Sequence, residues 1–139
     1  MTAPTSGLEG AIPREDLARI KPTMLWLAAD AASAMRREPS SGGKGPGDNQ
    51  FRTLVQLCRE ADIPEEIDAY LGYQGGRRNR PEQEGWRPQD TKRMLEALKQ
   101  LRDEATKLGL PKTPSVTLTL YAFFFGYVYW QVKAAPRGA

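Results

Sequence analysis

The sequence predicts an all-α protein, a small bundle of about five helices. Three observations lead to this fold class. Apolar residues recur three and four positions apart along most of the chain, which is the spacing of one face of an α-helix. Prolines and glycines divide these stretches into segments of helical length. The β-branched residues that favour strands are sparse outside residues 113–119.

Length and composition point to one domain. The chain has 139 residues, of which 40 % are hydrophobic, so it is long enough for one modest core but not for two. We expect a flexible leader over residues 1–12, a single helical domain over residues 13–135 and a short tail over residues 136–139. Within the domain, the Gly- and Pro-rich stretch 39–47 is predicted to be a flexible linker.

The first helix is predicted over residues 13–38. Pro22 lies inside it and could instead interrupt it, opening a second segment as its first helical residue. The apolar residues at helical spacing, which we expect to form the buried face, are Met24, Leu25, Leu27, Ala28, Ala31, Ala32 and Met35.

Two shorter helices are predicted after the linker. One covers residues 50–61, with Asp48 or Asn49 as its N-cap. The other begins at Pro64, which suits the first helical position, and the glycines of residues 72–76 are expected to end it. Their apolar stripes are Phe51, Leu54, Val55, Leu57 and Cys58 in one and Ile67, Tyr70 and Leu71 in the other.

A long helix is predicted from Pro88 to about Leu108. Gly109 follows it directly and is a natural helix stop. The residues expected to line its apolar side are Met94, Leu95, Leu98, Leu101, Ala105 and Leu108.

The uncharged segment 116–132 allows three interpretations. Thr113 and Pro114 resemble a cap and a first helical residue, and a helix that is apolar all round is typical of the centre of a bundle. Seventeen uncharged residues also approach the length that crosses a bilayer, with aromatic residues beside Lys133 as an interfacial belt. The alternation at residues 116–120 fits a strand. We favour the buried helix, because polar residues dilute the hydrophobicity of the segment.

The residue types that carry most enzyme chemistry are missing. The chain has no histidine, and Cys58 is its single cysteine, so it lacks the commonest general base and a thiolate zinc site. Cys58 lies on an apolar helical stripe, where a thiol is usually a small buried hydrophobe. The acidic pairs Glu65–Glu66 and Asp103–Glu104 are expected on the solvated surface. We therefore predict a protein that is not an enzyme and that uses no cofactor or metal.

The first residues bear on location. Residues 1–10 have neither the basic nor the apolar region of a signal peptide. Together with the single cysteine, this favours a cytoplasmic protein.

The most distinctive stretch is the glycine-hinged arginine cluster at residues 73–81, which reads YQGGRRNRP. Arginine pairs with phosphate and stacks on bases, and Tyr73 and Trp86 flank the cluster as stacking surfaces. Residues 77–99 carry seven basic and four acidic side chains, so the region is locally basic. A solvated loop is the plain alternative. The predicted nucleic-acid-binding residues are Arg77, Arg78, Arg80, Arg87, Lys92, Arg93 and Lys99.

Three segments carry a resemblance to a known family. NQFRTLVQLCREA leads into IDAYLGYQGGRR, and the chain closes with the aromatic helix YAFFFGYVYWQVKA. In character and order these segments resemble the small helical subunit of type III CRISPR effector complexes, over roughly residues 15–135. The Gly- and Pro-rich stretch 39–47 departs from the compact pattern of that family.

The resemblance implies a non-catalytic subunit of a crRNA-guided ribonucleoprotein in antiviral defence. Copies would stack beside one another and support the guide–target duplex through basic residues. On this chain the nucleic-acid contacts would come from Arg77, Arg78, Arg80 and the face of Lys92, Arg93 and Lys99. The acidic segment 60–68 would contact neighbouring subunits.

The alternative is a protein–protein adaptor that uses the aromatic C-terminal helix, and a less favoured one is a tail-anchored membrane protein. The expected partners are crRNA or target nucleic acid and other subunits of an effector complex, with self-association possible. No small-molecule substrate is expected, and the membrane is the least favoured partner.

Overall fold

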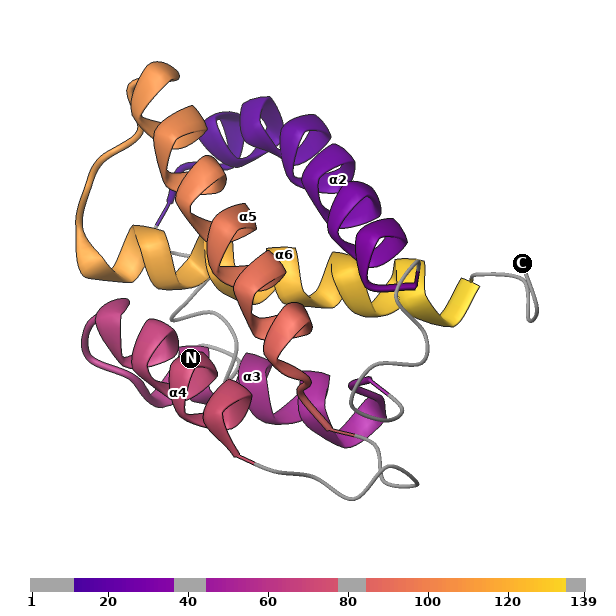
Figure 1. Ribbon diagram of the computed structural model, residues 1–139. Coiled ribbons are helices and arrows are strands. Elements are labelled where there is room, and N and C mark those ends of the chain that lie inside the picture. Colours follow the sequence, from indigo (N-terminus) through magenta and orange to yellow (C-terminus); the bar gives the residue numbers. More distant parts are fainter. Residues whose placement is uncertain (1–11, 37–44, 78–84, 135–139) are drawn as a thin grey trace.

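The structure is a computed structural model that describes residues 12–36, 45–77 and 85–134 (Figure 1). These residues form α-helices and no strand, which confirms the all-α prediction. Residues 1–11 of the predicted leader, the predicted tail and residues 39–44 of the predicted linker lie outside the described residues. Ile12, the last residue of the predicted leader, is buried in the core. The helices are α2 (Arg14–Arg36), α3 (Asp48–Glu60), α4 (Glu65–Gly76), α5 (Pro88–Lys107) and α6 (Pro114–Ala134).

The last helix, α6, is the centre of the arrangement. In Figure 1 it runs across the molecule with α2 on one side and α3 on the other, and it packs against both. The α5 helix packs against α2 and α4. The α2 helix therefore packs against both α5 and α6.

The composition of α6 fits this central place. Tyr121, Phe124, Phe125 and Val128 are fully buried, and each such side chain stabilises the fold by roughly 1.5–3 kcal/mol. The prediction of a buried core helix is confirmed, and the strand interpretation is wrong. Within the described residues, no helix combines the length and the apolar character needed to cross a membrane.

The first helix runs without a break through Pro22, so the alternative of an interruption there is wrong. Six of its seven predicted core residues are buried, and Leu25 is the exception. Leu25 lies on the outer side of α2 with Trp26, whose side chain is 65 % exposed. The apolar stripe of α2 is wider than the surface that its neighbours cover, so the spacing pattern alone could not separate the two sides.

The boundaries of α3 and α4 differ from prediction by a few residues. Gly47 is the N-cap of α3, and its N–H donates to the side chain of Gln50 at 2.9 Å, so Asp48 already lies inside the helix. The α4 helix continues to Gly76, although its glycines were expected to end it.

One glycine of α4 has a packing reason. A Cβ added to Gly75 would overlap the Thr91 hydroxyl of α5, so the missing side chain lets the C-terminal end of α4 approach the start of α5. The two helices are antiparallel neighbours, because the start of α4 shares a cavity with the second half of α5. As predicted, Gly109 ends α5, and its φ of +78° is one that glycine adopts without strain.

Candidate nucleic-acid interface

Of the predicted basic residues, Arg77 and Lys92 lie at the end of the α4–α5 pair where α4 ends and α5 begins. We call this region the basic end and define it by Arg77, which caps the C-terminus of α4, and Lys92 in the first turns of α5. The missing side chain of Gly75 lets the two helix ends lie close together beside Thr91. Arg78 and Arg80 follow Arg77 in the sequence and lie outside the described residues.

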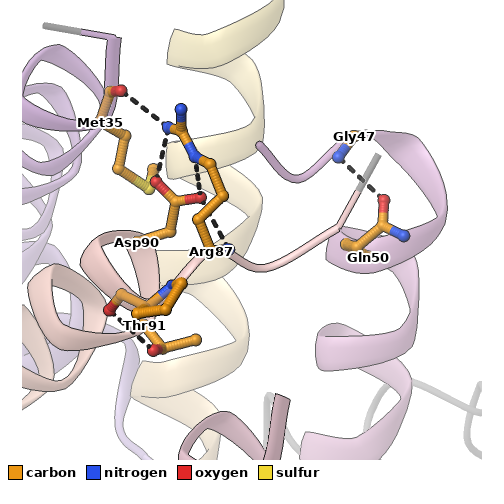
Figure 2. Close-up of polar contacts among 7 residues, drawn as sticks. Met35, Gly47, Gln50, Arg87, Asp90 and Thr91 are labelled. Atoms are coloured by element: carbon orange, nitrogen blue, oxygen red, sulfur yellow. Dashed lines mark hydrogen bonds and ion pairs between the residues drawn. The ribbon is translucent and has the colours of Figure 1, made fainter. Parts of the chain in front are cut away.

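Arg87 does not belong to the exposed surface. Its side chain is 5 % exposed and forms a two-point ion pair with the fully buried Asp90, with Nε–Oδ2 and Nη2–Oδ1 distances of 2.7 and 2.8 Å. As Figure 2 shows, Nη2 also donates to the backbone oxygen of Met35, at 3.0 Å. Arg87 is thus held inside the protein, and this placement corrects its prediction as a phosphate-binding residue.

The ion pair has a structural role at the start of α5. Arg87 is the N-cap, and its backbone N–H donates to Oδ2 of Asp90 at 3.1 Å, so the carboxylate caps the helix start. Met35 lies near the end of α2, so the guanidinium also binds a C-terminal carbonyl of that helix. The contact joins two helix ends that are 52 residues apart in sequence.

The segment before α5 also contacts other parts of the chain. Gly85 donates its N–H to the backbone oxygen of Gly45 at 3.1 Å. Trp86 is buried and packs edge-on against Phe51 of α3, with ring centroids 5.5 Å apart. Trp86 was expected to be an exposed stacking surface, and the structure places it in the core. A tryptophan between a glycine and an arginine gave no periodic signal from which its burial could be predicted.

Arg77 and Tyr73 lie together at the exposed end of α4. The Arg77 guanidinium carbon is 5.7 Å from the centre of the Tyr73 ring, and the Tyr73 side chain is 64 % exposed. This is a cation–π arrangement on the last turn of α4. It presents a positive charge and a flat ring on the same exposed surface, which are the two groups that bind phosphate and stack on bases in single-stranded nucleic acid.

The basic residues of α5 lie among acidic ones. Lys92 is exposed and forms no ion pair with another described residue. Arg93 pairs with Glu96, and Lys99 pairs with Asp103, both at 3.3 Å. Exposed pairs of this kind contribute about 0–1 kcal/mol, so either cation can exchange its partner for a phosphate at small cost. The α5 surface is nevertheless of mixed charge, whereas the sequence count had indicated a basic one.

Neither the cysteine nor the potential metal ligands of the described residues form a reactive site. Cys58 is buried, and burial raises its thiol pKa to about 12, so the thiol stays protonated at neutral pH. In the described part of the chain, no group of three or more potential ligands could hold a metal ion.

Fold and surface together define a small helical protein with one exposed arginine–tyrosine pair at the basic end. No protein-family model matches the chain, and no curated protein or solved structure shows significant similarity to it. The assignment of function therefore depends on the residues themselves.

Proposed function

We propose that this protein is a non-catalytic subunit of a crRNA-guided ribonucleoprotein effector complex that contacts the nucleic-acid backbone through its basic end. The observation that carries the proposal is the exposed Arg77–Tyr73 pair at the end of α4, directly before Arg78 and Arg80 in the sequence. The resemblance of the sequence segments to type III CRISPR small subunits supplies the kind of complex.

The proposed contact neutralises phosphates and does not read base edges. Arginine side chains donate to phosphate oxygens, and an exposed tyrosine ring stacks on any base, so binding should depend little on sequence. Lys92 adds a charge on the neighbouring helix, and Arg93 and Lys99 can join it by leaving their exposed ion pairs. The proposed residues are Arg77, Arg78, Arg80, Lys92, Arg93 and Lys99, with Arg87 removed.

The test is the salt dependence of binding to an unstructured single-stranded RNA. Each phosphate that the protein no longer neutralises should lower the slope of the logarithm of affinity against the logarithm of salt concentration by about 0.7. We expect Arg77→Ala to lower the slope by about this amount, and the combined replacement of Arg77, Arg78 and Arg80 by alanine to lower it further.

Arg59→Ala is the matched control, because Arg59 is an exposed arginine in the last turn of α3 and its removal changes the net charge equally. The proposal fails if the combined variant binds with unchanged affinity and slope, or if Arg59→Ala has the same effect as Arg77→Ala.

A protein–protein adaptor is the second candidate, and one observation favours it. Trp130 of α6 is 62 % exposed and contacts Tyr127, and Trp26 is exposed on α2. Large exposed aromatic side chains often mark protein interaction sites. Most of the aromatic segment of α6 is buried, however, so the candidate surface is smaller than the sequence had indicated. Association of purified protein that Trp130→Ala abolishes, without affinity for RNA, would favour the adaptor.

A further inference from the structure

A second polar site lies at the opposite end of the α4–α5 pair from the basic end. It is a cavity of about 610 Å³ between the start of α4, the second half of α5 and the first half of α6. Sites for small molecules commonly have volumes of about 300–1,000 Å³. The size of this cavity is thus suited to a small organic ligand.

Three polar side chains from three helices meet in the cavity wall. Nη1 of Arg102 donates to the hydroxyl of Tyr121 at 2.6 Å, and the buried ring of Tyr121 fixes the position of that hydroxyl. Asp68 of α4 lines the same cavity. Its Oδ1 atom is buried and has no hydrogen-bond partner within the described residues. Leaving a carboxylate oxygen buried without a donor is costly.

The electrostatics of the cavity are mixed. Burial raises the pKa of Asp68, the nearby Arg102 opposes this change, and Glu65 adds to it. The carboxylate therefore lies in the field of Arg102 without a hydrogen bond to it. The charged side chains that line the cavity are the acidic Glu65, Asp68 and Asp103 and the basic Arg102 and Lys112.

These groups select the ligand by its charges. A simple anion meets a lining with three acidic and two basic side chains. A simple cation near Asp68 meets the guanidinium of Arg102. A ligand with both charges avoids each conflict, because its ammonium can donate to the carboxylate while its oxyanion accepts from the remaining N–H groups of Arg102. The exposed side chain of Ile63 lines the same cavity and offers contact to an aliphatic group.

We propose that the cavity binds a small aliphatic zwitterion with an amine and a carboxylate, of the type of a free aliphatic amino acid. Asp68 receives the amine, and Arg102, held by Tyr121, receives the carboxylate. The sequence predicted no small-molecule substrate, and this ligand is bound without being transformed. The site is independent of the proposed nucleic-acid contact, because the two lie at opposite ends of α4 and α5.

The experiment is calorimetric titration of the full chain with L-leucine and two single-charge analogues. The analogue 3-methylbutylamine lacks the carboxylate, and 4-methylpentanoate lacks the amine. Removing one charge-assisted hydrogen bond should weaken binding about tenfold or more. We expect leucine to bind and both analogues to bind at least about tenfold more weakly. No binding of leucine, or equal binding of either analogue, overturns the proposal.

Two variants connect the binding to the cavity. Asp68→Asn keeps the shape of the side chain and removes its charge, and we expect it to weaken leucine binding about tenfold while the protein stays folded. Tyr121→Phe removes only the hydroxyl that holds Arg102 and should also weaken binding. Asp30→Asn is the control, because Asp30 is exposed on α2 and the substitution removes the same charge. If Asp68→Asn binds leucine like the wild type, the site assignment is wrong.

Discussion

The ion pair of Arg87 and Asp90 shows how an arginine predicted to lie on the binding surface can instead be buried. Both side chains are buried, and both carboxylate oxygens accept from the guanidinium. A buried pair is expensive to desolvate, but removing one partner costs more, because the other charge stays buried without compensation. The sequence shows Arg87 three residues before Asp90. This spacing does not predict that the pair is buried, because the burial depends on the end of α2.

We expect Arg87→Ala to lower the free energy of unfolding by about 3–5 kcal/mol, because it leaves Asp90 buried without its partner. Arg93→Ala on the same helix breaks an exposed pair and should cost at most about 1 kcal/mol. Urea unfolding of the two variants measures the difference. Similar decreases in both would show that the Arg87 pair is no more important than a surface contact.

The Cys58 thiol predicts a decrease of stability in alkali. Burial raises its pKa to about 12, whereas the unfolded thiol ionises near pH 8.5. Between these values the native state holds a proton that the unfolded state has released, so the free energy of unfolding falls as pH rises. We expect a decrease of about 1 kcal/mol between about pH 8 and pH 9.5 from this group. Urea unfolding at both pH values should show a smaller decrease in Cys58→Ala, and an equal decrease would contradict this account.

At the scale of the elements, the helices were largely predictable and their ends were not. The spacing of apolar residues identified α5, and a glycine at position 109 identified its stop. In α3, Phe51, Leu54 and Cys58 of the predicted stripe are buried, whereas Val55 and Leu57 are partly exposed. The glycines of α4 were expected to end the helix, because glycine is unfavourable inside helices. Packing against α5 overrides that preference, since Gly75 lies against Thr91 and only a residue without a side chain fits there.

This explanation of α4 predicts opposite effects for two glycines of one helix. We expect Gly75→Ala to destabilise the protein by about 1–3 kcal/mol, because its Cβ forces α4 away from α5. A Cβ added to Gly72 would meet no atom within 4 Å. Because alanine favours the helix more than glycine does, Gly72→Ala should stabilise the protein by about 0.5–1 kcal/mol. Thermal unfolding of both variants is the measurement. If Gly75→Ala unfolds at the same temperature as the wild type, α4 and α5 do not approach each other as closely at Gly75 and Thr91 as described.

At the scale of the whole molecule, the bundle separates two exposed regions with different chemistry. The first is the basic end, formed by the end of α4 and the start of α5. The second is the cavity of Asp68 and Arg102, which lies at the start of α4 and the second half of α5. The sequence indicated the first region, because arginines cluster in a short stretch. It could not indicate the second, because its residues come from three helices that are distant in sequence and meet only in the fold.

The proposed function places this protein inside a guide-RNA complex. The most direct measurement is purification of the tagged full chain from its native host, with sequencing of any RNA that accompanies it. The account predicts short RNAs of uniform length together with larger protein subunits, and the disappearance of that RNA when Arg77, Arg78 and Arg80 are replaced by alanine. Recovery of protein partners without RNA would contradict it and would favour the adaptor.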